Sequence, residues 1–133
     1  MNKLLLTLSV MAFSGSLLAQ VSPSTPKAAR VRISLGPGIE LSREHLTIIT
    51  WTVNNPGGSP EHYGVVHYGS DPKDLSQIAR NPMRLNPSHS STVFRVRLDN
   101  LEPRTTYYYT VDSMDANGTS DRVTSPVNNF TTP

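Results

Sequence analysis

Apolar and polar residues alternate along much of this chain, and this period of two restricts its fold more than any other feature. In the segment 46–53, Ile49, Trp51 and Val53 occupy alternate positions with threonines between them. Successive side chains of a β-strand point to opposite faces of a sheet, so such a segment presents one apolar and one polar face. Similar segments, separated by clusters of Gly, Pro and Asn, lie at 29–36, 63–69, 91–101, 106–111 and 127–132. The spacing predicts an all-β sandwich of about seven strands in two antiparallel sheets.

One stretch does not follow this pattern. At 71–79 we expect either a short helix, capped by Asp71 with Leu75 and Ile78 on one face, or an irregular strand.

The alternating segments together place enough apolar side chains inward for one core. The sixteen expected core positions are Val31, Ile33, Leu35, Ile49, Trp51, Val53, Val66, Tyr68, Phe94, Val96, Leu98, Leu101, Tyr107, Tyr109, Val111 and Phe130.

The first 19 residues have the pattern of a secretory signal peptide. Lys3 gives a positive start, an apolar run follows from Leu4 to Phe13, and the small residue Ala19 precedes the expected cleavage point. The run is too short to span a bilayer comfortably, and no second apolar segment follows. We therefore expect a secreted or periplasmic protein without a membrane span. A flexible Pro/Ser-rich lead-in at 20–28 would precede one domain at 29–133.

Charge and cysteine content exclude several classes of protein. Cleavage after Ala19 removes Lys3 alone among the charged residues, which leaves 11 Lys and Arg against 10 Asp and Glu. So balanced a charge does not predict nucleic-acid binding. The chain has no cysteine, which excludes a disulfide, thiol catalysis and cysteine-ligated metal sites. It also argues against an antibody-type domain, whose core needs a Cys–Trp–Cys arrangement.

Three consecutive tyrosines fall within one of the predicted strands. Because side chains alternate, Tyr107 and Tyr109 would point into the core while Tyr108 points outward, so the three rings cannot form one patch. Leu101 and Pro103 precede them with the spacing L-x-P-x-x-x-Y, which resembles fibronectin type III domains. That resemblance implies a tyrosine corner, in which the hydroxyl of the first tyrosine hydrogen-bonds back to the backbone. Structural core roles are expected for Trp51, Tyr68, Leu101, Pro103, Tyr107 and Tyr109.

Longer stretches narrow the resemblance. The segments "VVHYGSDPKDLSQIA", "VFRVRLDNLEPRTTYYYTVDS" and "NNFTTP" resemble the N-terminal, fibronectin-III-like domain of purple acid phosphatases. With "RVRISLG" and "ITW" included, the resemblance covers residues 28–133. One departure is Arg104, where the turn of that family usually has Gly. Arg is tolerated there if its backbone keeps a negative φ.

The resemblance also implies what this chain lacks. In that family a second, larger domain holds two metal ions and carries the chemistry, with motifs of the types D-x-G, G-D-x-x-Y, G-N-H-D/E and G-H-x-H. None of these occurs here. The four histidines, expected on a strand edge, two loops and an outer face, also show no metal-binding spacing: His45, His62, His67 and His89. We therefore expect no catalytic residue, cofactor or metal site in this chain.

Two short motifs are best explained without a ligand. The sequence "DANG" at 115–118 resembles the start of a calcium loop, but it is too short and lacks the closing glutamate, so a turn at Asn117 and Gly118 is expected. Asn117 and Asn129 each begin an N-glycosylation tripeptide. Whether either is glycosylated stays open, although a bacterial-type signal and a strand position favour incidental matches.

Two surfaces are candidates for binding. If the first strand shares a sheet with 49–53 and 93–98, one outer face would carry four arginines, namely Arg30, Arg32, Arg95 and Arg97. They form either a solvated face or a site for an anionic cell-envelope polymer. The outer face of the other sheet would carry Tyr63, Val65, His67 and Tyr108, which could dock a protein domain, a sugar or a second copy of the chain.

These observations favour an exported, non-catalytic β-sandwich that acts as an accessory, scaffold or interaction module. The alternative is the N-terminal domain, as a fragment or a separately encoded part, of a metal-dependent phosphoesterase like the purple acid phosphatases. In that case acid phosphatase activity and metal binding would reside in another domain.

Overall fold

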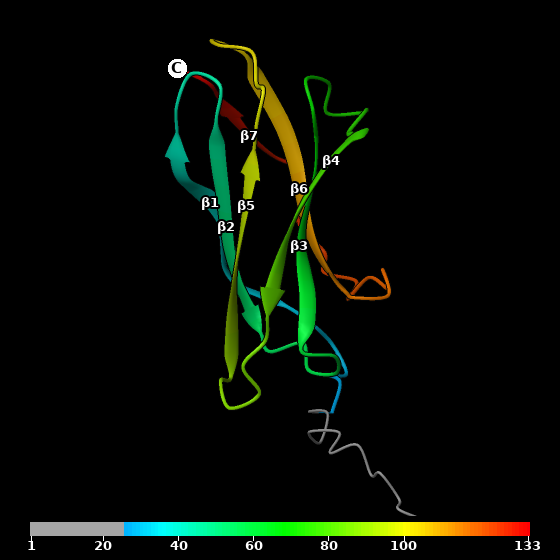
Figure 1. Cartoon of the computed structure of the whole chain (residues 1–133). Coiled ribbons are helices and arrows are strands. Elements are labelled where there is room, and N and C mark those ends of the chain that lie inside the picture. Colours follow the sequence, from blue (N-terminus) through cyan, green and yellow to red (C-terminus); the bar gives the residue numbers. More distant parts are fainter. Residues whose placement is uncertain (1–25) are drawn as a thin grey trace, which may run out of the picture.

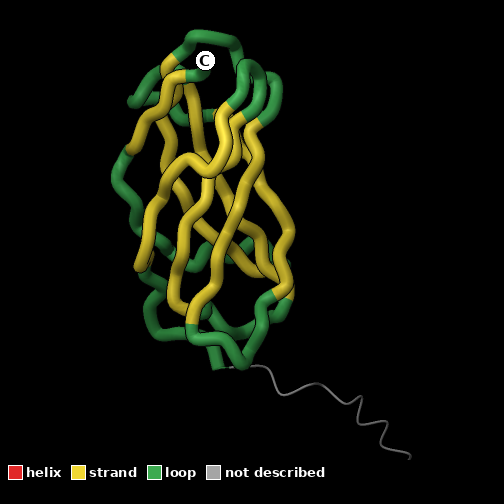
Figure 2. The backbone as a smooth tube through the Cα atoms, turned by 90° about the vertical axis from the view of Figure 1, so that its left-hand side faces the viewer, coloured by secondary structure: helices red, strands yellow, loops and turns green. Residues whose placement is uncertain are grey.

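The computed structural model of the chain describes residues 26–133, which form a sandwich of two antiparallel sheets (Figure 1). These residues contain the strands β1 (Ile33–Ser42), β2 (Thr47–Asn54), β3 (Glu61–Gly69), β4 (Gln77–Arg84), β5 (Ser91–Leu98), β6 (Thr106–Asp115) and β7 (Asn128–Thr131). One sheet has the order β1-β2-β5 and the other the order β4-β3-β6-β7. Figure 2 shows the strands along the long axis, with the loops gathered at the two ends. The predicted sandwich is confirmed, while the predicted signal peptide lies outside the described residues.

The core lies where the two apolar faces meet. Every second residue of β2 is buried, and β5 and β6 alternate in the same way because one face of each strand lies against the opposite sheet. The ring of Trp51 stacks on Phe94 at 5.5 Å between centroids, and Tyr107 stacks on Phe130 at 5.7 Å. Of the expected core positions all are buried except Ile33, which is partly buried against the core, and Leu35. Val65, Leu85 and Val123 are buried as well, which the pattern did not predict.

Leu35 is the one expected core residue that lies in solvent, with 72% of its surface exposed. The sequence predicted a strand at 29–36 with Val31, Ile33 and Leu35 on one inward face. In the structure β1 begins at Ile33, and the pairing with β2 shifts between Ile33 and Leu35. A shift of one residue turns a side chain to the opposite face of the sheet, so Leu35 pairs with the outward Thr52.

The segment 71–79 does not form a helix. Asp71 accepts a hydrogen bond from the Lys73 amide at 2.9 Å within a tight turn, and strand β4 then begins at Gln77. This strand lies at the edge of its sheet and pairs with β3 along its whole length, and most of its side chains are exposed. Pro82 is accommodated there because an edge strand does not need every amide for pairing. The expected irregular strand is thus closer to the structure than the expected helix.

The tyrosine corner is present at the start of β6. The Tyr107 hydroxyl accepts a hydrogen bond of 2.8 Å from the Glu102 amide, so it satisfies a backbone donor. Leu101 is buried beneath the corner, and Pro103 is half-buried in the turn itself. Arg104 has φ of 51°, so the expectation of a negative φ is wrong. The turn keeps the left-handed geometry that suits glycine, with an arginine in it.

Candidate interaction surfaces

The four arginines of the predicted anion surface do not form one group. Arg95 and Arg97 lie on the outer face of β5, opposite Thr50 and Ile48 of β2. Arg30 and Arg32 precede β1, and their backbone groups hydrogen-bond the side chain of Asn54 at 2.9 and 2.6 Å. Asn54 lies six residues from Ile48, about 20 Å along an extended strand. The structure therefore brings together only two of the four.

Those two arginines already have carboxylate partners. Arg95 forms a two-point ion pair with Glu40 of β1, and Arg97 Nε lies 2.6 Å from Asp99 Oδ1. Both pairs are exposed, so each is weak and open to competition. An anionic polymer would have to displace a carboxylate at each position.

The four residues of the predicted docking face do share the outer face of the four-stranded sheet. Tyr63, Val65 and His67 occupy alternate positions of β3, and Tyr108 lies opposite Gly69 on β6. Tyr63, His67 and Tyr108 are half-buried, so their rings remain partly accessible. Val65 is only 6% exposed and is therefore not part of the accessible surface. Its place is the floor of a shallow groove.

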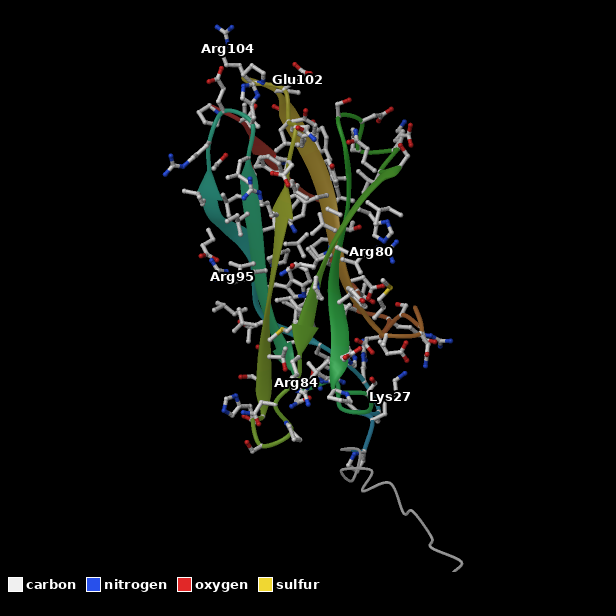
Figure 3. The ribbon with its side chains drawn as sticks, viewed as in Figure 1. Lys27, Arg80, Arg84, Arg95, Glu102 and Arg104 are labelled. Carbon is white, nitrogen blue, oxygen red and sulfur yellow. The ribbon has the colours of Figure 1, made fainter. Side chains whose placement is uncertain are left out.

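The groove over Val65 is formed by the chain returning across the sheet after β6. Met114 and Ser120 form an isolated antiparallel bridge, which holds the chain that follows β6 alongside the end of that strand. One wall carries His67, Ile78 and Arg80, and the other carries Asp112, Gly118 and Ser120. Figure 3 shows Arg80 on the opposite side of the sandwich from Arg95, so the groove and the ion-paired arginines belong to different faces.

The acidic residues in the last part of β6 are used by the fold. Asp112 accepts hydrogen bonds from the Ser120 hydroxyl at 2.6 Å and from the Val123 amide at 3.2 Å. Asp115 Oδ1 accepts from the Asn117 and Thr119 amides at 2.9 and 3.0 Å. A calcium ion would need that same carboxylate, so the predicted turn describes "DANG" better than a calcium loop.

A buried cluster at the start of β3 was not predicted. His62 was expected in a loop, yet it lies in β3 with 2% of its surface exposed. Its Nε2 lies 3.3 Å from Asp121 Oδ2, and its Nδ1 lies 2.9 Å from the Ser59 carbonyl oxygen. Asp121 Oδ2 also accepts a hydrogen bond of 2.6 Å from the buried Ser113 hydroxyl. The sequence pattern could have predicted this burial, because His62 lies two residues before Gly64 and so shares the inward face of the strand with Gly64, Val66 and Tyr68.

Opposing effects set the ionisation of this pair. Burial alone would lower the pKa of His62, but the close carboxylate of Asp121 and the hydrogen bond to the Ser59 carbonyl outweigh it, so the pKa is raised above 6.5. Burial alone would raise the pKa of Asp121. The contact and charge of His62, the hydrogen bond from Ser113 and the charge of Lys27 outweigh burial and lower the pKa of Asp121 below 3.8. Both shifts favour a protonated imidazole beside an ionised carboxylate.

The other histidines do not converge. His45 Nδ1 lies 2.9 Å from the Leu101 carbonyl oxygen, His89 contacts Asn86, and His67 lies on the outer face of β3. Among residues 26–133, no group of three or more His, Asp or Glu side chains gathers in a way that would hold a metal ion. Within the same residues, no helix is sufficiently long and apolar to cross a membrane.

Comparison with known proteins agrees with this architecture. Residues 39–132 match the family model of the purple acid phosphatase N-terminal domain. No curated protein matches the chain. The sensor domain of the anti-sigma factor RsgI4 from Pseudobacteroides cellulosolvens aligns over 79% of this chain and 96% of its own length, with 16% identity and a TM-score of 0.51.

Two further solved structures contain fibronectin type III domains. The FN1–FN3 domains of chicken CNTN1 align over 80% of this chain and 32% of theirs, with 15% identity and a TM-score of 0.48. The fn3 domain of human contactin 1 aligns over 89% of each chain, with 14% identity and a TM-score of 0.41. Residues 26–133 form an all-β sandwich with antiparallel sheets of three and four strands, and the chain has no cysteine.

Proposed function

The chain belongs to the family of purple acid phosphatase N-terminal domains, and on that premise we propose that it acts as an exported, non-catalytic interaction module. The observation that carries this proposal is the use of its acidic side chains. Asp112, Asp115 and Asp121 each accept hydrogen bonds from the fold itself. A two-metal hydrolytic site needs a cluster of free His, Asp and Asn ligands, and the residues from Pro26 onward bring no such cluster together.

An activity assay tests the non-catalytic part of the proposal. The purified chain is incubated with a phosphomonoester and with Fe or Zn, and no turnover above the metal blank is expected. Turnover that a chelator removes would contradict the proposal.

The outer face of the four-stranded sheet is the surface we propose for docking another protein domain. Tyr63, His67 and Tyr108 keep aromatic edges accessible there, and the groove over Val65 adds an apolar floor. The ion pairs of Arg95 and Arg97 make the opposite sheet less available to an anionic partner. A protein domain is therefore favoured over an anionic cell-envelope polymer.

A photoreactive amino acid placed in the exported chain tests this surface. A benzophenone side chain at position 108 is expected to give a crosslinked adduct in the extracytoplasmic fraction. The matched control carries the same group at position 50, which is half-buried on the other sheet. Equal adducts from both positions, or none from position 108, would contradict docking through this face.

Export is proposed from the pattern at 1–19. Mass spectrometry of the chain recovered from the medium or periplasm is expected to show a new N-terminus at Gln20. Recovery of the full-length chain from the cytoplasm alone would contradict it.

The alternative is that the chain is the N-terminal domain of a larger purple-acid-phosphatase-like enzyme, with metal binding and acid phosphatase activity in another domain. The family match favours it, because the matched model is by its name one part of such a phosphatase. A reading frame continuing beyond Pro133 into motifs such as G-D-x-x-Y and G-N-H-D/E would support this alternative.

A further inference from the structure

The buried imidazole of His62 is held between two hydrogen-bond acceptors. Nδ1 lies 2.9 Å from the Ser59 carbonyl oxygen, and Nε2 lies 3.3 Å from Asp121 Oδ2. The Ser59 oxygen is a carbonyl and cannot donate to the ring, and the Asp121 oxygen, which accepts from Ser113, cannot donate while the carboxylate is ionised. Beside an ionised Asp121, the position of His62 therefore favours a proton on both ring nitrogens.

A neutral ring cannot meet this requirement. With its proton on Nδ1, the lone pair of Nε2 would face the Asp121 carboxylate. With the proton on Nε2, the lone pair of Nδ1 would face the Ser59 carbonyl oxygen. Loss of the charge would also leave Asp121 as a buried anion. Among the described residues Asp121 Oδ1 and His62 Nε2 both lack an aligned hydrogen-bond partner, so the 3.3 Å approach of His62 to Asp121 is a contact between charges rather than a hydrogen bond.

We propose that protonated His62 and ionised Asp121 form a buried, pH-dependent clasp that holds the returning segment 119–123 against the sandwich in mildly acidic surroundings and loosens it as His62 loses its proton. Asp121 is the residue at which this segment enters the core: its amide donates to the Ser113 carbonyl at 2.8 Å, and its carboxylate meets His62. The clasp thus joins β3, β6 and the β6–β7 connection.

The clasp also borders two neighbouring features. Residues 119–122 line a groove with residues 27–31, which include the end of the lead-in, and within this groove the Ala28 amide donates to the Pro56 carbonyl at 2.8 Å. Gly118 and Ser120 form one wall of the groove over Val65 on the outer face. Opening the clasp would therefore loosen the lead-in and reshape the proposed docking face together.

The charged groups around the clasp support the same ionic pair. Asp115 of β6 lies opposite His62 and favours its protonated form, while Lys27 of the lead-in favours ionised Asp121. Glu61 adjoins His62 on β3 and is paired in register with Arg84 of β4, so these two opposite charges largely offset each other. Arg122 follows Asp121 directly and adds a further positive charge to the segment.

The pH window follows from the directions of the two shifts. Because the pKa of His62 is raised, its contribution to stability is complete below 6.5 and is lost as pH rises through the folded-state value. Because the pKa of Asp121 is lowered, its contribution is complete above 3.8 and is lost as pH falls through the folded-state value. The clasp is therefore strongest between these two pH values.

Nuclear magnetic resonance of the purified chain tests the clasp directly. The ring signals of all four histidines are followed from pH 4 to 9, and His62→Gln identifies the signal of His62. We expect His62 to titrate with a midpoint above 6.5, because its protonated form is favoured. A midpoint below 6.5, or a neutral ring over the whole range, would overturn the proposal even if His62→Gln does not fold, because the other histidines can be assigned from His45→Gln, His67→Gln and His89→Gln.

Hydrogen exchange supplies the second readout. The exchange rate of the Asp121 amide is first corrected for the intrinsic pH dependence of amide exchange. This corrected rate is expected to rise as pH passes through the titration midpoint of His62, by about tenfold for each unit by which closing the clasp raises the pKa of His62. His89→Gln changes an exposed histidine and should leave this dependence intact, whereas His62→Gln should remove it. Exchange that is independent of pH in the unmodified chain, or unchanged in His62→Gln, would overturn the clasp.

Discussion

Substitution of Arg104 by glycine is expected to stabilise the domain. A left-handed backbone costs an L-residue about 1–2 kcal/mol, and Arg104 is held there with φ of 51°. Glycine adopts this conformation freely, but its greater freedom in the unfolded chain costs about 0.5–1 kcal/mol. The Arg104 amide donates to the Pro133 carbonyl at 3.3 Å, and glycine keeps that bond. A net gain of about 0.5–1 kcal/mol in the free energy of unfolding should remain.

The side chain of Arg104 contributes little that would be lost. Figure 3 shows it projecting away from the end of the domain, and among the described residues it takes part in no ion pair. Arg104→Ala is the matched control, because it removes the guanidinium but keeps the Cβ that makes the left-handed region costly. Only the glycine variant should therefore gain stability.

Urea unfolding followed by tryptophan fluorescence measures the effect. Trp51 is the chain's one tryptophan and is buried in the core, so its emission reports global unfolding. Arg104→Gly should raise the midpoint at an unchanged slope, and thermal unfolding should shift upward by about 2–6 °C. If Arg104→Ala were as stable as Arg104→Gly, or if Arg104→Gly were less stable than the unmodified chain, the backbone argument would be refuted.

Three further substitutions test the core, the corner and the buried ion pair. Tyr107→Phe removes the hydroxyl that accepts the hydrogen bond from the Glu102 amide, and it should lower the free energy of unfolding in urea by about 1 kcal/mol. An unchanged urea midpoint would argue against a stabilising role of the tyrosine corner. Gly64→Ala would place a methyl group 3.1 Å from two core side chains and should cost about 1–3 kcal/mol, whereas no loss would show that the core relaxes there. Asp121→Asn should lower stability at pH 5 and remove the loss of stability that Asp121 causes in the unmodified chain as pH falls below 3.8. If the melting temperature of the variant fell with decreasing pH just as that of the unmodified chain does, the role of Asp121 would be contradicted.

The parts of the fold that the sequence predicts are those in which each strand is packed on a single face. In β2, β5 and β6 every second residue is buried, so alternation alone identifies both the strand and its inward side chains. The corner was predictable for a different reason. Leu101, Pro103 and Tyr107 act within one short stretch, so their spacing carries the geometry without knowledge of strand pairing.

The errors arise where the structure depends on register or on distant neighbours. Leu35 is displaced to solvent by a shift in the β1–β2 pairing. Strand β4 was difficult to predict because most of its side chains are exposed, so its sequence has no alternation of apolar and polar residues. The four arginines are not brought together as one group, because residues on different strands become neighbours only in one register and Arg30 precedes the start of β1. His62 was missed because a histidine in a turn-rich stretch was assigned to the loop, although its phase with Val66 placed it inside.

The two ends of the sandwich should respond differently to pH. At one end, Thr132 donates its amide to the Thr105 carbonyl at 3.0 Å and its hydroxyl to the Glu102 carbonyl at 2.6 Å. Only backbone and hydroxyl groups take part there, so those bonds have no titratable partner near neutral pH. At the other end, the segment around Asp121 depends on the charge of His62. In one exchange experiment between pH 5 and 9, corrected protection of the Thr132 amide should therefore stay constant while that of the Asp121 amide falls. Parallel loss at both ends would mean that the whole domain unfolds as one unit and that no local clasp exists.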